Sequence, residues 1–291
     1  MKISLSVTSF TWPDGPGGIA GRLAELARIA DDSRLDTIWV ADHPLQSDPA
    51  CSPDEPMLDA YTTLGQLAGL TGRIRLGTLV SCASFRAPAL LIKAVTTLDV
   101  LSGGRAWLGV GAGYNEREAR AMGLDLPPVA ARYDRLIDTL ELAARMWVDD
   151  RSRFDGRSTV LEAPVSSPLP LSRPRPPILI GGVGERRTLP LVARYADACN
   201  LFDLPDSGNA LRRQLGVIER ECAALGRPYE EVEKTVTTFL REGEPETDLV
   251  RRCRELASIG LDHVVVIVRG RAFDRAEVEL LGRAADRLAH A

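Results

Sequence analysis

The sequence is poor in the residues that build metal centres and disulfide frameworks. Its three histidines, His43, His263 and His290, are far apart, and no two of its five cysteines form a Cys-x-x-Cys pair. Scattered histidines argue against a His-based metal centre, so we expect no metal. An odd number of unclustered cysteines is typical of reduced thiols, which predicts a cytoplasmic protein.

Long apolar runs and a strong excess of one charge are also missing. No stretch approaches the roughly 20 apolar residues that cross a bilayer, and the N-terminus alternates apolar and polar residues, so we expect no signal peptide. The formal net charge is −4 over 291 residues. Nucleic-acid binding requires a clustered basic face. We therefore expect neither a membrane nor a nucleic-acid partner.

Short β-branched or apolar runs alternate with helical periodicity along the whole chain. A helical stripe follows each run; near the C-terminus, for example, Val278, Leu281, Ala285 and Leu288 recur on one face. Eight strand–helix units predict a parallel sheet with right-handed crossovers. They favour an α/β fold closed as a (β/α)₈ TIM barrel over an open doubly wound sheet. The predicted strands are residues 3–7, 37–40, 74–80, 105–110, 178–180, 198–202, 234–239 and 263–268.

One segment, residues 149–177, interrupts this alternation. It contains six prolines between Pro164 and Pro177, and the residues around Gly156 predict a short hairpin. Long irregular connections are usually functional lids or linkers. We interpret the segment as an insertion between the fourth helix and the fifth strand, within one domain of residues 1–291. A linker between two domains is the alternative.

In such a barrel, the catalytic residues lie in the loops that follow the strands. Asp42-His43 follows the second strand, and His43 is the candidate acid–base residue because histidine titrates near neutral pH. The alternative is a histidine that satisfies only loop groups. Cys82, after the third strand, has no local partner that would activate its thiol and is interpreted as a wall residue. Arg269 and Arg271 follow the last strand and are either anion-binding or solvated.

Two glycine-rich turns also follow predicted strands. Gly181-Gly182-Val183-Gly184 precedes a helix expected to start near Glu185, where exposed backbone N–H groups would bind a phosphate. A plain tight turn is the alternative. Residues 109–113 resemble part of a dinucleotide fingerprint, but Tyr114 replaces its last glycine and the motif lies in mid-chain. We interpret these glycines as a surface on which a flat ring lies close to the backbone.

At these residues the sequence resembles the luciferase-like monooxygenase superfamily, and within it the oxidoreductases that depend on coenzyme F420, a deazaflavin. The similarity covers nearly the whole chain, and the order and spacing of its motifs carry it. The motifs are residues 33–43 (SRLDTIWVADH), 71–78 (TGRIRLGT), 98–105 (LDVLSGGR), 108–116 (LGVGAGYNE), 175–182 (RPPILIGG) and 193–197 (ARYAD).

The resemblance implies a dimeric barrel with a flavin or deazaflavin across its strand ends and an insertion over its mouth. It implies that Asp42 contacts the cofactor and that His43 acts beside the hydride-transferring carbon. It also implies a non-proline cis peptide at Leu79-Val80, in a bulge behind the ring. The residues assigned to the cofactor are Asp42, Leu79, Val80, Cys82, Ala112, Gly113, Asn115, Gly181, Gly182, Val183 and Gly184.

The resulting hypothesis is a cytoplasmic homodimer that transfers hydride between coenzyme F420 and a small organic substrate. The alternatives are a monooxygenase that uses FMN and O₂, and a non-catalytic flavin- or deazaflavin-binding protein. Sugar-phosphate dehydrogenases of this group have a catalytic glutamate where this chain has Tyr114, and hydroxyl residues where it has Leu79 and Cys82. We therefore expect a substrate other than a sugar phosphate.

Overall fold

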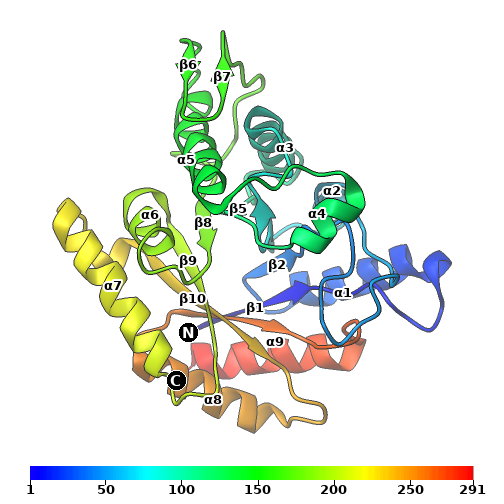
Figure 1. The fold of residues 1–291 in the computed structure, drawn as a ribbon. Helices are drawn as coiled ribbons and strands as arrows, with labels where there is room; N and C mark the ends of the chain where they lie inside the picture. Colours follow the sequence, from blue (N-terminus) through cyan, green and yellow to red (C-terminus); the bar gives the residue numbers. More distant parts are fainter. Residues whose placement is uncertain (291) are drawn as a thin grey trace.

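A ring of parallel strands surrounded by helices forms the centre of the protein in the computed structural model, which describes residues 1–290 (Figure 1). The strands follow the order β3-β2-β1-β11-β10-β9-β8-β5-β4 around the sheet. They are β1 (Lys2–Val7), β2 (Thr37–Val40), β3 (Arg75–Thr78), β4 (Ser81–Cys82), β5 (Leu108–Gly111), β8 (Ile178–Gly181), β9 (Ala198–Phe202), β10 (Glu233–Phe239) and β11 (His263–Ile267).

The two ends of this sheet meet because β3 and β4 are parts of one barrel strand. β3 pairs with β2, while β4 pairs with β5. Leu76 of β3 also bridges to Ala106, and the N–H of Trp107 donates to the carbonyl of Leu76 at 2.8 Å. The described strands therefore close into the predicted eight-stranded barrel and do not form an open sheet. The Leu79-Val80 bond between the two parts is cis, as the resemblance implied.

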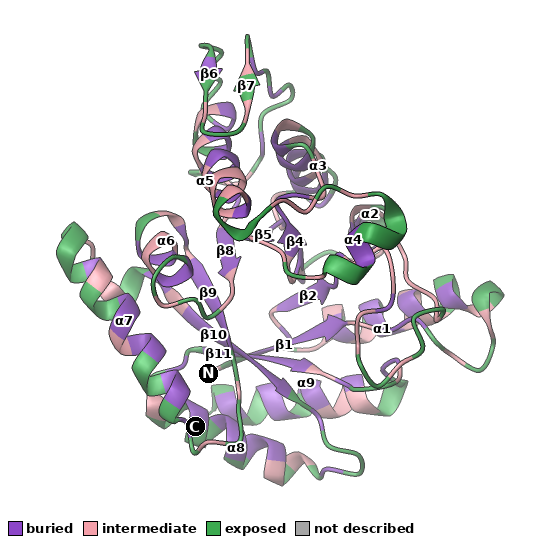
Figure 2. Cartoon of the chain, in the orientation of Figure 1, coloured by how far each residue is buried: buried purple, intermediate pink, exposed green. Residues whose placement is uncertain are grey.

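Seven helices of the described chain return from the end of one barrel strand to the start of the next, and an eighth follows the last strand. Figure 2 shows their buried residues on the side that faces the barrel. In the last helix, all four residues of the predicted stripe are buried. The helices are α1 (Ile19–Asp32), α2 (Ala60–Leu70), α3 (Pro88–Leu101), α5 (Val129–Met146), α6 (Thr188–Tyr195), α7 (Asn209–Leu225), α8 (Glu246–Ile259) and α9 (Arg275–Ala289); shorter elements are α4 (Glu116–Met122), η1 (Pro16–Gly18) and η2 (Tyr229–Glu231).

None of the helices within residues 1–290 is long and apolar enough to cross a membrane. The strands account for the core, because their branched side chains pack between the ring and the helices. Ile3 of β1, Leu108 of β5, Ile180 of β8 and Val264 of β11 are all fully buried. This burial on both sides of each strand is what a parallel sheet covered by helices requires.

Residues 149–177 contain the predicted hairpin, formed by β6 (Phe154–Asp155) and β7 (Val160–Leu161), followed by an irregular strap, residues 162–177. Two fully buried carboxylates hold this insertion on the outer helices. Asp138 of α5 accepts the backbone N–H groups of residues 157 and 158 at 2.8 and 2.7 Å. Asp99 of α3 accepts those of residues 171 and 172 at 2.7 and 2.9 Å. β8 pairs with β5 across the insertion, so both flanks belong to one sheet.

The insertion lies away from the mouth of the barrel. In Figure 1 the hairpin stands at the end of α5 that is far from α4. No residue between 149 and 177 lines the central cavity described below. The expectation that this segment covers the mouth is therefore wrong. The reason is the position of the two carboxylates that bind the insertion. Asp99 and Asp138 lie in the second halves of α3 and α5, and these helices run from the mouth back toward the starts of the strands. The insertion is therefore held at the far side of the barrel.

Candidate active site

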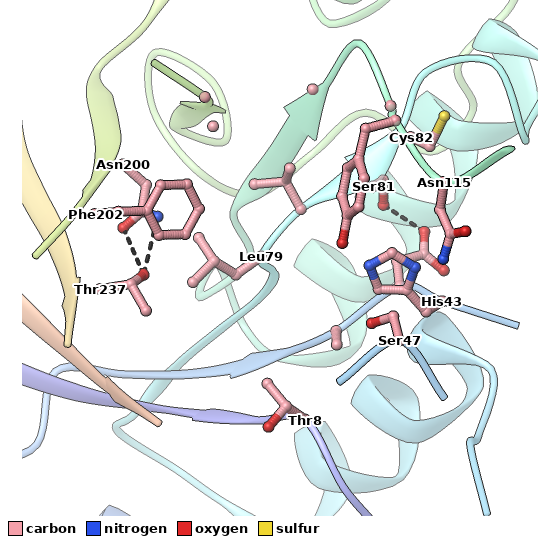
Figure 3. Close-up of a pocket in the computed structure, with 18 of the residues that line it drawn as sticks. Thr8, His43, Ser47, Leu79, Ser81, Cys82, Asn115, Asn200, Phe202 and Thr237 are labelled. Carbon is pink, nitrogen blue, oxygen red and sulfur yellow. Dashed lines mark hydrogen bonds between the residues drawn. The ribbon is translucent and has the colours of Figure 1, made fainter. Parts of the chain in front are cut away.

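A cavity of about 630 Å³ opens where the barrel strands end. This volume is in the range of sites that hold organic cofactors and substrates. Its lining residues follow all eight barrel strands, as the barrel architecture requires. Figure 3 shows His43, Ser81 and Asn115 on one side of Leu79, and Asn200, Phe202 and Thr237 on the other. Every residue predicted for the site lines this one cavity: Asp42, His43, Leu79, Val80, Cys82, Ala112, Gly113, Asn115, Gly181, Gly182, Val183 and Gly184.

His43 is held by a carboxylate that sequence reasoning missed. Its Nδ1 lies 2.8 Å from Oε2 of Glu118, a residue with 0% of its surface exposed. The other oxygen, Oε1, accepts the backbone N–H of Leu45 at 3.1 Å. Nε2 of His43 has no hydrogen-bond partner among the described residues. The imidazole therefore presents one free nitrogen at a cavity wall, which is what an acid–base residue needs.

Helix α4 delivers Glu118 to this position. The side chain of Asn115 caps the helix by accepting the backbone N–H of Glu118 at 3.1 Å, so Glu118 lies in the first turn, where a negative charge is favourable. An Asn-x-x-Glu pattern is a sequence-level sign of a helix start. This pattern places Glu118 on the helix, but it does not indicate that Glu118 contacts a histidine 75 positions earlier.

Asp42 takes part in a separate network beside His43. Its carboxylate accepts the Oγ–H of Ser81 at 2.6 Å and two N–H groups of Arg86 at 2.8 and 3.1 Å. Arg86 also reaches Asp59 at 2.7 Å. A nearly buried carboxylate needs such charge-paired hydrogen bonds. The network ties the loop after β2 to β4, and it thereby holds the segment that contains the cis peptide.

Glycines face Val80 and Cys82 on one wall of the cavity, so no side chain stands between them and the backbone opposite. A Cβ at Gly181 would lie 2.9 Å from Cγ1 of Val80, and a Cβ at Gly113 would lie 2.1 Å from Sγ of Cys82. Gly113 also has a φ of +82°, which a side chain disfavours. Burial raises the pKa of the Cys82 thiol, which agrees with its interpretation as a wall residue and not a nucleophile.

The glycine loop at 181–184 forms a further part of the cavity lining. The helix after it, α6, begins at Thr188 and not near Glu185, because the intervening residues form a turn closed by the N–H of Thr188 on the carbonyl of Gly184 at 2.8 Å. The hydroxyls of Tyr133 and Thr188 lie 2.7 Å apart, and a Cβ at Gly184 would come within 2.8 Å of Oγ1 of Thr188. These two hydroxyls, which the sequence did not reveal, line the cavity beside the glycine loop.

Polar groups also face the cavity from its floor and far wall. Oγ of Ser6, on β1, is buried and has no hydrogen-bond partner in the described chain. An unpaired buried hydroxyl calls for an explanation, and a bound ligand would supply one. On β9 and β10, Asn200 donates to Oγ1 of Thr237 at 3.0 Å, as the dashed lines in Figure 3 mark.

The two arginines after the last strand have different environments. Arg271 is engaged by Glu277, with Nη1 at 2.8 Å from Oε2. Arg269 lines the cavity, lies 5.1 Å from the ring centroid of Phe239 and is 3.8 Å from Asp48. Within residues 1–290, no group of three or more His, Cys, Asp or Glu side chains is arranged to hold a metal ion.

This barrel, with its cavity at the strand ends, is matched by a known family. The family model described as luciferase-like monooxygenase matches residues 1–290, and the chain belongs to this family. An F420-dependent glucose-6-phosphate dehydrogenase from Kineococcus radiotolerans is 28% identical over 252 residues, which cover 83% of this chain and 70% of that protein.

Solved structures share the fold. An F420-dependent secondary alcohol dehydrogenase in complex with an F420-acetone adduct superposes with a TM-score of 0.79 at 14% identity, over 97% of each chain. The coenzyme F420 dependent tetrahydromethanopterin reductase from Methanopyrus kandleri superposes with a TM-score of 0.78 at 16% identity, over 99% of each chain.

Proposed function

We propose that this protein is an oxidoreductase that transfers hydride between coenzyme F420 and a small organic substrate. One observation carries the proposal: a single cavity joins the free Nε2 of His43, the glycine-faced wall at Leu79-Val80 and the glycine loop at 181–184. An acid–base group, a surface for a ring and a phosphate site are the parts that this chemistry needs. The F420-dependent relative and structural neighbours support the same assignment.

The residues present fit such a cofactor. The wall at Leu79-Val80, where Gly111 and Gly181 face Val80 without a side chain, suits a planar ring. The loop at 181–184, with the hydroxyls of Tyr133 and Thr188, suits a phosphate. When bound, F420 supplies a ring carbon that accepts or donates hydride, while the protein orients it and excludes water.

His43 would move the proton that accompanies the hydride. In oxidation, Nε2 accepts the proton of a substrate hydroxyl or amine, and in reduction the imidazolium returns it. Tyr114 lies edge-on to the imidazole, with ring centroids 5.9 Å apart at 72°.

We propose a substrate that is uncharged or carries one negative group. Apart from His43, the one basic side chain that lines the described cavity is Arg269, whereas Asp42, Asp48 and Glu118 are acidic. A phosphate dianion is normally bound by several cationic groups or N–H donors. Tyr114, Phe202 and Phe239 add partly exposed aromatic surface, which favours an apolar body over a sugar phosphate.

Titration of the purified protein with F420 and with FMN tests the cofactor assignment. We expect tight binding of F420, and a change in its absorbance when a panel of alcohols and carbonyl compounds is added. Preferred binding of reduced FMN with consumption of O₂ would instead establish a monooxygenase. Tight F420 binding without turnover on any substrate would indicate a non-catalytic binding protein.

We also propose that the protein is a homodimer. The strap crosses α3, where Asp99 binds residues 171 and 172, and this region exposes large apolar side chains. The strap face is defined as Leu90, Leu101, Leu169 and Leu171, which are 69%, 63%, 39% and 52% exposed. Neighbouring exposed leucines of this kind are typical of a contact surface between protein chains.

We propose a cytoplasmic location because the cysteines form no disulfides in the described chain. All five are unpaired, and four of them are buried among core residues. Proteins that mature in oxidising compartments usually pair their cysteines.

A further inference from the structure

We propose that Glu118 is a positioning residue for the reaction: it fixes His43 in the tautomer whose Nε2 carries the lone pair. The inference rests on the proposed role of His43 as the acid–base group. Glu118 does not need to touch substrate or cofactor for this role. It acts through one hydrogen bond, the 2.8 Å contact between its Oε2 and Nδ1 of His43.

The surroundings of Glu118 determine whether Glu118 or His43 donates the hydrogen in the bond between them. An ionised carboxylate offers acceptors only. One oxygen already accepts the backbone N–H of Leu45 at 3.1 Å, so this oxygen faces a fixed donor. The other oxygen can accept only if Nδ1 of His43 carries the hydrogen. In the neutral imidazole the lone pair then lies on Nε2, the nitrogen without a protein partner.

The fold also holds this pair rigidly. Glu118 lies in the first turn of α4, where the cap at Asn115 fixes its backbone. Its side chain is fully buried, so few rotamers are open to it. The ring of Tyr114 lies edge-on to His43, with ring centroids 5.9 Å apart. A general base that is oriented by a buried carboxylate loses little entropy when it meets its substrate.

The proton balance follows for an alcohol substrate. Its O–H bond would break as an Nε2–H bond forms on His43, and oxidised F420, when bound, would supply the acceptor for the hydride released from the C–H bond. The alcohol becomes a carbonyl compound and loses two electrons. The positive charge that develops on the imidazole lies beside the Glu118 carboxylate, which stabilises it. Reduction of a carbonyl compound reverses each of these steps.

Glu118→Gln tests the proposal because glutamine has one acceptor and one donor group. It cannot accept from both Leu45 and His43. If its NH₂ group faces Nδ1, the imidazole hydrogen must move to Nε2, and the base is blocked. We expect kcat/KM to fall by about 10²-fold or more, with the Kd of F420 unchanged. Glu116→Gln is the matched control: it alters an exposed carboxylate of the same helix turn and should leave both values unchanged.

A double-mutant cycle separates positioning from other roles. If Glu118 acts through His43, Glu118→Gln should cause no further loss in a His43→Ala background. An equal loss in both backgrounds would show that Glu118 acts elsewhere, and would overturn the proposal.

The tautomer itself can be observed without any turnover. The chain has three histidines, so ¹⁵N NMR of the labelled imidazoles gives few signals. His263, which is bonded at both nitrogens to Glu233 and Ser4, serves as an internal reference. We expect His43 to carry its hydrogen on Nδ1 in the wild type and to lose that preference in Glu118→Gln. Hydrogen on Nε2 in the wild type refutes this inference, whereas absence of F420 turnover refutes the proposed function instead.

Discussion

Two histidines of this protein are each paired with a carboxylate, at opposite ends of the barrel. His43 and Glu118 meet at the C-terminal ends of the strands, where the cavity opens. His263 and Glu233 meet at the strand starts, with Nδ1 and Oε1 2.8 Å apart. Nε2 of His263 is engaged by Ser4 at 2.6 Å, and the residue is buried. The free nitrogen of His43 is what distinguishes a candidate for chemistry from a structural contact.

His43→Ala should lower turnover by about 10²-fold or more, because it removes the group that exchanges a proton with the substrate. The Kd of F420, measured by fluorescence titration, should stay close to that of the wild type. His290→Ala is the control, since His290 is exposed and its ring is hydrogen-bonded to the carbonyl of Asp286, far from the cavity lining. Undiminished turnover in a cofactor-loaded His43→Ala protein would remove this residue from the mechanism.

Glu233 should make the protein sensitive to acid. Burial by itself would raise the pKa of Glu233, but the hydrogen bond and charge of His263 and the ammonium of Lys2 lower it from 4.5 to about 2. The folded-state pKa is thus below the unfolded one, so this stabilisation is present above the unfolded pKa and is lost as the pH falls toward the folded pKa.

Glu233→Gln tests whether the free energy of unfolding falls with pH because of Glu233. Between about pH 5 and pH 2 the wild type should lose on the order of 2–3 kcal/mol more unfolding free energy than the variant. Urea unfolding at each pH gives the two curves. Parallel curves would show that the pKa of Glu233 is not lowered by folding.

At the scale of elements, closure of the barrel depends on a close approach between the third and fourth barrel strands. A Cβ at Gly109 of β5 would lie 1.7 Å from the carbonyl oxygen of Thr78, and Oγ1 of Thr78 donates to the carbonyl of Gly109 at 2.9 Å. Because this oxygen belongs to the backbone of a barrel strand, it can move away only if the two strands separate. Glycine is therefore required here for space.

Gly109→Ala should cost about 3 kcal/mol or more, the upper range for overpacking of a core. The matched control is Gly65→Ala in the middle of α2, where no atom lies within 4 Å of the added Cβ. That change should stabilise the protein by about 0.5–1 kcal/mol through helix propensity. Urea midpoints followed by circular dichroism compare the two, and equal midpoints would contradict the proposed crowding.

At the scale of the whole molecule, the insertion and the active site occupy separate regions. The strap is fastened to α3 by the buried Asp99, and the cavity is lined without it. The cavity is lined instead by the loops after the strands, among them the residues around Ser47 and Arg269. The exposed apolar strap face is left available for a second copy of the chain.

If the strap face is the interface of the proposed dimer, the double variant Leu101→Glu, Leu171→Glu should yield a monomer, because like charges would face each other across a self-complementary interface. Light scattering after size exclusion measures the mass. Val129→Glu and Leu225→Glu, at apolar positions that are 55% and 51% exposed on other helices, serve as controls. A dimer that survives the Leu101 and Leu171 changes must use another surface.

Several features could be predicted because they depend on short segments. The strands and helices follow the local alternation of apolar residues, and the glycine turns and Asp42-His43 follow strand ends, which a barrel gathers at one face. Other features depend on contacts between distant segments. The pairing of His43 with Glu118, of Asp42 with Arg86, and of Tyr133 with Thr188 leaves no periodic signal in the chain.

By itself, the sequence determined the closed barrel and the strand ends that surround its cavity, because burial periodicity and the order of the strand-end motifs are local properties, and the family resemblance added the cofactor-side residues. Only the tertiary structure decided which carboxylate orients His43, and that the insertion lies on the outer helices and not over the mouth. Both outcomes depend on where buried acidic side chains find N–H donors. Glu118, Asp99 and Asp138 each find theirs in a segment far away in the sequence.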